Sequence, residues 1–286
     1  MARPRSSKGS DVEEQGQSPL RTCFSGRVKR VFLDWSRPAV IALIQYLQAS
    51  VPVSPGQPPR WDLSGYRVVL PTGWSSRRFL ARLADIAAGQ KLVLFPPDVI
   101  TVGRLPETLY PHHRPLADEA TCLLAWWAAI KELAYADENL LHRLFPAYQP
   151  TMKPAQQLAL AQLLASFHRE VLGAGYDCRT VLDEALKHDP KFPDQQRWET
   201  LCKLEEYYLK ALHGCGLWDI DFARREALKN NECRTDREIL LVGLVDLPPI
   251  VRDMLRQVGN RVTALVLAPY SLHDHSDDLG CLIPEQ

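Results

Sequence analysis

The segment from Tyr66 to Leu83, YRVVLPTGWSSRRFLARL, most narrowly constrains what this chain can fold into. A short apolar run breaks at PTGWSS, and apolar residues then recur at helical spacing at Phe79, Leu80 and Leu83. Strand, tight loop and helix in this order form the unit that cradles phosphate in nucleotide-binding proteins. The question is whether the loop still carries the groups that bind phosphate.

Short apolar runs alternate with helical stretches along the first part of the chain. We predict strands over 31–35, 66–70, 91–95 and 98–102, and helices over 38–48 and about 76–88. The strand signal returns over 238–245 and 261–269, with a proline-started helix between them. Alternation of this kind favours an α/β fold whose parallel sheet is covered on both faces.

The region between these parts is almost wholly helical, and two of its helical segments run to glycines at Gly175 and Gly216, where helices commonly end. Its aromatic residues could stack on bases, but on apolar helix stripes we expect them in the core; they are Trp126, Trp127, Trp198, Tyr207 and Tyr208. We therefore predict a disordered tail over 1–25, the first part of the α/β domain over 26–112, a helical insertion over 113–235 and a return to the sheet over 236–286.

Composition excludes several function classes. The 34 basic and 34 acidic residues balance, so any nucleic-acid contact must come from local patches. The seven cysteines form no CxxC pair, which speaks against zinc and disulfides. No segment approaches the about 20 apolar residues that cross a membrane, and no signal peptide opens the chain. We expect a cytoplasmic protein with reduced thiols and no membrane contact.

The loop does not match the phosphate-binding pattern G-x-x-x-x-G-K-[ST] in either register. With Gly73 as the second glycine, Trp74 takes the lysine position and Val68 the first glycine position. With Ser76 as the second glycine, Arg77 takes the lysine position, Arg78 the hydroxyl position and Pro71 the first glycine position. We interpret the segment as a degenerate nucleotide-binding loop made of Thr72, Gly73, Trp74, Ser75, Ser76, Arg77 and Arg78.

The second half of an ATPase site would lie in ILLVGLVDLPP. Superfamily I helicases carry D-E-φ-Q-D-T-x-P-φ-Q here, and that pattern places Val242 at the metal-binding aspartate and Gly243 at the catalytic glutamate. Asp246 takes the second aspartate. Since both catalytic carboxylates are replaced, we expect neither ATP nor magnesium as a cofactor and no catalytic residue.

The chain over roughly 26–286 resembles the N-terminal helicase-like region of AddB-type subunits of double-strand-break repair nucleases, which are related to RecBCD. The resemblance rests on the two degenerate regions and on FLDWSRP (32–38), PPDVITVGRLPETLY (96–110), GLWDIDFARREAL (216–228) and SDDLGCL (276–282). It implies a P-loop NTPase-like, superfamily I helicase-like parallel sheet with a large helical insertion, serving DNA repair by homologous recombination. Full-length relatives are ATP-dependent exonuclease subunits.

Such subunits end in a PD-(D/E)XK nuclease domain, often with a cysteine-held iron–sulfur cluster. We find neither an Asp followed at strand spacing by (D/E)-x-K nor a suitable cysteine cluster, so we expect the nuclease to be missing from this chain. The acidic and imidazole residues of HDHSDD (273–278) could be read as a metal site, but their consecutive spacing favours a solvated loop. We predict no metal.

Four arginines are candidate contacts for DNA phosphate or a vestigial nucleotide: Arg77, Arg78, Arg82 and Arg104. The alternative is that they are ordinary surface residues. Trp74 could stack on a base or pack against the insertion, and we expect it to pack.

Three functions follow from these expectations. The first is a non-catalytic helicase-like scaffold that binds DNA ends or a motor partner such as an AddA-like helicase–nuclease subunit. The second is a divergent DNA-dependent ATPase that uses Arg77 and Asp246. The third is a protein-interaction module without DNA affinity, whose binding to duplex ends would be absent or independent of salt.

Overall fold

The computed structural model describes residues 21–25 and 28–283 of the chain. Its strands are β1 (Arg21–Ser25), β2 (Val28–Phe32), β3 (Arg60–Asp62), β4 (Tyr66–Leu70), β5 (Val93–Phe95), β6 (Asp98–Thr101), β7 (Glu238–Val242) and β8 (Val262–Val266). Its α-helices are α1 (Ala39–Ser50), α2 (Gly73–Gly89), α3 (Glu119–Leu144), α4 (Pro154–Gly173), α5 (Cys178–His188), α6 (Gln195–Gly214), α7 (Ile220–Lys229) and α8 (Pro249–Gln257). Short 3₁₀ helices are η1 (Val102–Arg104), η2 (Pro106–Thr108), η3 (Gly259–Arg261) and η4 (Tyr270–His275).

The strands form a six-stranded sheet in the order β1-β2-β8-β7-β4-β6. β1 runs antiparallel to β2. The other five strands of this sheet run parallel to one another; they are β2, β8, β7, β4 and β6. The predicted α/β class with a parallel sheet is therefore confirmed. The strand predicted over 91–95 is present as β5, but it pairs in parallel with β3, which was not predicted, in a separate two-stranded ribbon. β1 lies inside the range 1–25 for which a tail was predicted, and residues 1–20 lie outside the described residues.

One face of the sheet is covered by α1 and α2. Leu43 of α1 and Phe79 and Leu83 of α2 share a buried cluster with Val68 of β4 and Leu240 of β7. Alternate residues of a strand point to opposite faces, so the neighbours of these strand residues face the other side. Both faces of the central strands are therefore buried, as the continuous apolar runs predict.

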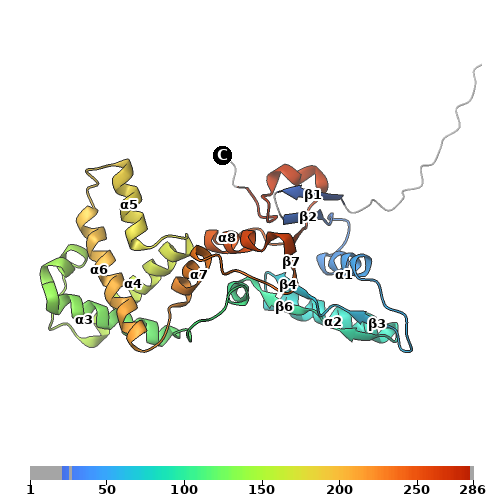
Figure 1. The fold of residues 1–286 in the computed structure, drawn as a ribbon, viewed down its shortest axis with the longest axis horizontal. Helices are drawn as coiled ribbons and strands as arrows, with labels where there is room; N and C mark the ends of the chain where they lie inside the picture. Colours follow the sequence, from blue (N-terminus) through green and yellow to red (C-terminus); the bar gives the residue numbers. More distant parts are fainter. Residues whose placement is uncertain (1–20, 26–27, 284–286) are drawn as a thin grey trace, which may run out of the picture.

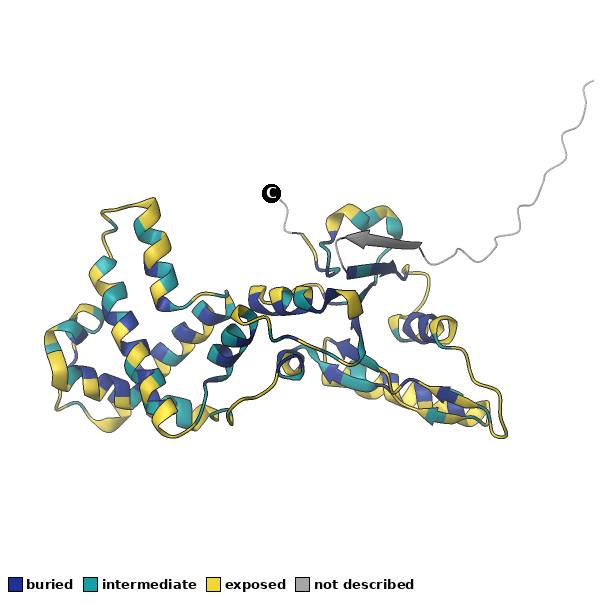
Figure 2. Ribbon diagram, in the orientation of Figure 1, coloured by how far each residue is buried: buried dark blue, intermediate teal, exposed yellow. Residues whose placement is uncertain are grey.

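The opposite face is covered by α7 and α8. Ala223 of α7 and Met254 of α8 lie in a second buried cluster with Val69 of β4 and Leu241 of β7. Figure 2 shows buried residues along the strands and on the helix sides turned toward them, with exposed residues outward. α7 falls within the predicted insertion 113–235 but packs into this core of the sheet.

The helices α3 to α6 form a separate helical unit beside the sheet, with α7 and α8 between the two (Figure 1). The buried core of this unit includes Trp126 and Tyr208, whose rings stack with centroids 4.2 Å apart. The prediction of core positions is confirmed for Trp126 and Tyr208, whereas Trp127, Trp198 and Tyr207 are partly buried at the edges of the helical clusters. The chain leaves and returns side by side, since Trp218 N–H donates to the Pro115 carbonyl and Ala117 N–H to the Trp218 carbonyl. The two ends of the helical segment are therefore adjacent, as expected of an insertion.

Candidate functional site

The carboxyl ends of β4 and β7 form the candidate site. β4 and β7 are neighbours with Val69 paired to Leu241, so Thr72 and Gly243 follow them at the same edge of the sheet. The chain then continues into α2 on one face and into α8 on the other. In open α/β sheets, adjacent strands whose connections diverge in this way leave a crevice where ligands bind. The fold therefore brings the two degenerate regions together.

The connection from β4 to α2 is only two residues long, because β4 ends at Leu70 and α2 begins at Gly73. Thr72 caps the helix: its Oγ1 accepts from Ser75 N–H at 3.2 Å, and Ser75 Oγ accepts from Thr72 N–H at 3.2 Å. This reciprocal pair is a capping box. It satisfies amides that a phosphate-binding loop would point at its ligand.

Neither register of the phosphate-binding pattern forms a loop. Val68 is buried inside β4, paired with Val99 on one side and Leu240 on the other. Ser76 lies in the first turns of α2 and donates its hydroxyl to the Thr72 carbonyl at 3.1 Å. The segment 72–78 is therefore a capped helix start, and its hydroxyl groups serve the cap.

Trp74 is 62% exposed, and the Arg78 guanidinium lies over its ring at 5.2 Å from the centroid. The expectation that Trp74 packs against the helical insertion is wrong. α2 begins at Gly73, three residues before the predicted start, so Trp74 lies on the solvent side of the first turn with Arg78 one turn further. Arg77 is also exposed.

The other two predicted arginines differ in their position. Arg104 is the last residue of η1, which directly follows β6, the neighbour of β4, and it is exposed at the same edge of the sheet. Arg82 lies further along α2, where it pairs with Asp85 at 3.8 Å, and both side chains are more than half exposed. The edge therefore presents Arg77, Arg78 and Arg104, whereas Arg82 lies beside it.

Sequence reasoning missed a second exposed tryptophan at this edge. Trp35, in the loop after β2, is 65% exposed, and its Nε1–H donates to the Leu267 carbonyl at 2.7 Å. The preceding Asp34 has a positive φ of 28° and accepts from Trp35 N–H. A signal was present, since Trp-Ser followed by arginine occurs after both β2 and β4, as WSR and as WSSR.

The two positions that the helicase pattern assigns to carboxylates, Val242 and Gly243, lie at the end of β7. Val242 is 2% exposed and pairs with Leu265 in the sheet. Gly243 has φ +58°, and a Cβ added there would lie 2.5 Å from Leu267 Cδ1. A side chain at Gly243 would need Leu267 or the backbone to move. A carboxylate at Val242 would instead be buried in the sheet without a partner for its charge.

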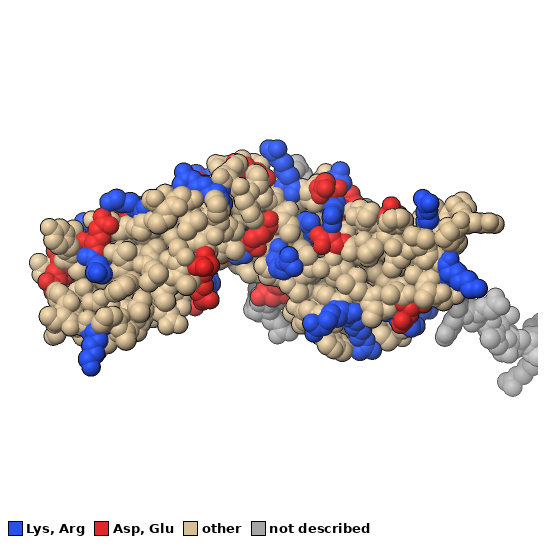
Figure 3. Space-filling model, turned by 90° about the horizontal axis from the view of Figure 1, so that it is seen from below, with Lys and Arg blue, Asp and Glu red and all other residues tan. Residues whose placement is uncertain are grey.

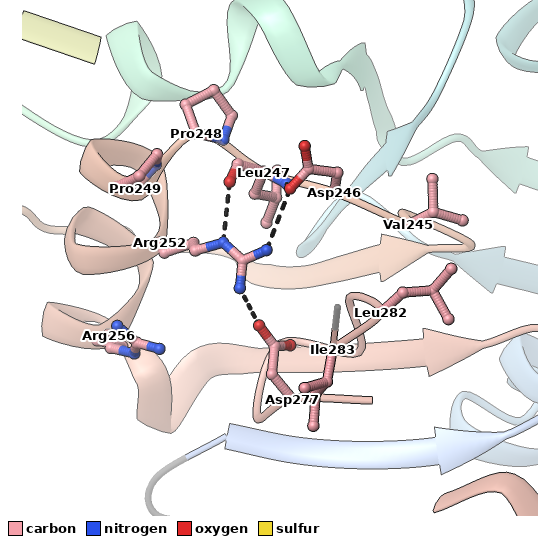
Figure 4. Close-up of a pocket in the computed structure, with 10 residues that line it drawn as sticks. All are labelled: Val245, Asp246, Leu247, Pro248, Pro249, Arg252, Arg256, Asp277, Leu282 and Ile283. Atoms are coloured by element: carbon pink, nitrogen blue, oxygen red, sulfur yellow. Dashed lines mark hydrogen bonds and ion pairs between the residues drawn. The ribbon is translucent and has the colours of Figure 1, made fainter. Parts of the chain in front are cut away.

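Asp246, at the second aspartate of the helicase pattern, borders a hollow of about 730 Å³ shown in Figure 4. The hollow is lined by Val245, Asp246, Leu247, Pro248, Pro249, Arg252, Arg256, Asp277, Leu282 and Ile283. None of residues 72–78 lines it, so it opens on the α8 side of β7. The side chain of Asp246 is 85% exposed and pairs with Arg252 at 3.2 Å.

The segment HDHSDD is only in part the solvated loop that was expected, since Asp274 and His275 are exposed but Asp277 and Asp278 are held by α8. Asp277 pairs with Arg252, and Asp278 receives two bonds of 3.1 Å from Arg256. The hydrogen bonds from Arg256 hold the pKa of Asp278 below its ordinary value, against the effect of burial. Within residues 21–25 and 28–283, no three His, Cys, Asp or Glu side chains gather as metal ligands. Asp277 and Asp278 are therefore structural partners of α8.

Basic side chains do not merge into one broad field. On the face seen from below, Lys and Arg lie interspersed with Asp and Glu (Figure 3). Attraction of nucleic acid over a long range is therefore weak on this face, and contacts depend on individual arginines.

A search of protein-family models finds no match to this chain, and a search of curated proteins finds none either. In the part of the chain that the structure describes, no helix has both the length and the apolar character of a membrane span.

Proposed function

We propose that this chain is a non-catalytic, helicase-like part of an AddB-type subunit in double-strand-break repair. Its parallel sheet descends in this proposal from a P-loop NTPase of superfamily I helicase type. The carboxyl edge of the sheet contacts nucleic acid without hydrolysing ATP. The collinear motif resemblance and the site geometry support this function. The geometry supports the loss of ATP hydrolysis and the contact with nucleic acid through different residues.

The loss of ATPase chemistry is supported by two independent features. The two-residue connection before α2 leaves no loop to surround a triphosphate, and Thr72 and Ser75 cap the helix instead. Gly243 lies where a catalytic glutamate would be needed, and Leu267 fills the space of its side chain. A divergent ATPase that relies on Arg77 and Asp246 would lack both a triphosphate cradle and a carboxylate to activate water.

The observation that carries the nucleic-acid contact is the exposed pair of Trp74 and Arg78 at the end of β4. An exposed tryptophan ring offers a flat apolar surface on which a base can stack. Such stacking contributes about 1–3 kcal/mol of binding free energy per base. Arginines beside the ring bind backbone phosphate in the same contact. Arg77 and Arg104 at the same edge extend the set of phosphate donors.

A protein-interaction module is the second candidate, favoured by the apolar rim of the hollow. Val245, Leu282 and Ile283 are each about half exposed or more and line the same hollow. A motor subunit of AddA type would be the partner in this alternative. The two candidates differ in whether isolated protein binds DNA.

DNA binding by the purified chain tests the proposal. Fluorescence anisotropy of a labelled blunt duplex and a labelled single strand is measured without nucleotide, for wild type and for Arg77→Ala/Arg78→Ala. The matched control is Arg179→Ala/Arg197→Ala, two arginines of the helical unit whose side chains are each 55% exposed. We expect the edge variant to bind at least about tenfold more weakly and the control to bind like wild type.

ATP turnover is measured on the same preparations. We expect no DNA-stimulated hydrolysis above background. DNA-stimulated turnover that Arg77→Ala abolishes would favour the divergent ATPase, and equal affinity of wild type and edge variant would contradict the proposed DNA contact.

A further inference from the structure

Arg252 of α8 joins two segments that lie far apart in the sequence. Its Nε–H donates to the Leu247 carbonyl at 2.8 Å, and its Nη2 lies 3.2 Å from the Asp246 carboxylate. Its Nη1 pairs with the carboxylate of Asp277, 25 residues further along the chain. Figure 4 shows the guanidinium at the point where these three oxygens converge. One cation therefore holds the loop after β7 against the C-terminal segment.

Asp277 in turn fixes the backbone of the segment that follows it through hydrogen bonds. Its Oδ1 accepts from Leu279 N–H at 3.0 Å and from Cys281 N–H at 2.9 Å. Leu282 N–H then donates to the Val245 carbonyl at 3.0 Å, closing the ring back to the β7 loop. The positions of the apolar rim residues therefore depend on the carboxylate that Arg252 neutralises.

The oxygens around Arg252 are of the kind that hard divalent cations bind. Two carboxylates and a backbone carbonyl are ordinary ligands for Mg²⁺, Ca²⁺ or Mn²⁺. Asp277 is only 16% exposed, so its charge needs a partner in the folded state. The guanidinium supplies that partner with a fixed fork of donors and never loses its proton.

We propose that Arg252 is a resident cation that replaces a divalent metal ion at the carboxyl end of β7. It holds the β7 loop and the C-terminal segment in place with no metal and no nucleotide present. This goes beyond the proposed function, because it does not depend on DNA binding.

The test is to remove the resident cation and offer a metal instead. Thermal unfolding of the full chain and calorimetric titration with MnCl₂ are compared for wild type, Arg252→Ala and the control Arg256→Ala. Arg256 lies one turn later on α8 and pairs with Asp253 and Asp278, so it controls for general loss of an α8 arginine. Wild type and control are expected to shift in Tm by less than about 1 °C in about 5 mM MnCl₂.

Arg252→Ala is expected to lower Tm by several degrees, and MnCl₂ is expected to restore about 3 °C of that loss with a measurable heat of binding. If Arg252→Ala does not fold, Arg252→Gln keeps the packing of the side-chain stem and is tested in the same way. In either variant, adding Asp277→Asn should abolish the response to manganese. The proposal is overturned if no Arg252 variant responds to manganese more than wild type, or if the response survives Asp277→Asn.

Discussion

Gly243 provides the sharpest test of why the catalytic carboxylates are absent. Its φ of +58° lies in the left-handed region, and an added Cβ would approach Leu267 Cδ1 to 2.5 Å and Cγ to 3.0 Å. The conformation alone costs a non-glycine residue about 1–2 kcal/mol. Overpacking against Leu267 adds about 1–3 kcal/mol, and the partly buried Leu267 side chain can lower this cost by moving aside. Gly243→Ala should therefore lower the free energy of unfolding by about 2–4 kcal/mol.

Urea unfolding followed by tryptophan fluorescence measures this difference, with an unchanged m-value showing that the same surface unfolds. Gly89→Ala is the control, because Gly89 ends α2 with open space around its Cβ position. It should change stability by no more than about 0.5 kcal/mol. The double variant Leu267→Ala/Gly243→Ala should lose less stability than the sum of the two single variants, because the steric clash is gone. The cost of the left-handed backbone conformation remains.

A Gly243→Ala protein within about 0.5 kcal/mol of wild type would refute the packing account. In that case a glutamate could be accommodated at this position, and the missing carboxylate would need another explanation.

Three further changes have defined outcomes. Val242→Asp should cost about 4 kcal/mol or more in urea unfolding, because it places an unpaired carboxylate at a site that is 2% exposed. Tyr208→Phe should cost about 1.5–3 kcal/mol, because its hydroxyl donates at 2.6 Å to the buried Asp219 carboxylate that caps α7; a loss below about 0.5 kcal/mol would contradict this role. The bond from Arg256 lowers the pKa of Asp278 in the folded state, so its stabilisation is present above the unfolded pKa of about 3.9 and is lost as pH falls through the lower folded value. Thermal unfolding should show Asp278→Asn less stable than wild type by a constant margin from about pH 5 to 8, shrinking below about pH 4; a margin independent of pH down to about pH 2 would contradict it.

The parallel sheet could be predicted because each of its central strands is recognisable from its own short apolar sequence. The runs VVL of β4 and ILLV of β7 are continuously apolar and buried, and the structure has β4 over Tyr66–Leu70 and β7 from Glu238. The segments predicted to run to Gly175 and Gly216 end as helices two residues earlier, at Gly173 and Gly214, and Gly175 and Gly216 follow with positive φ. The start of α2 was wrong by three residues, although Thr72 followed by Ser75 at capping-box spacing indicated it.

What could not be predicted depends on contacts between distant residues. Nothing near Gly243 in the sequence announces that Leu267 fills its side-chain space, because that contact arises from the pairing of β7 with β8. The partnership of Arg252 with Asp277 likewise spans 25 residues. Trp74 was expected to pack against the helical insertion, but it is 62% exposed with the Arg78 guanidinium over its ring, because α2 begins at Gly73.

The salt dependence of DNA affinity tests the central claim most directly. Each arginine that neutralises a phosphate contributes about −0.9 to the slope of log K against log salt on duplex DNA. We predict that wild type binds blunt duplex ends with a clear negative slope, and that Arg77→Ala/Arg78→Ala makes this slope shallower by about 2. Absent binding, or the same slope in both proteins, would contradict a nucleic-acid contact at the carboxyl edge of the sheet.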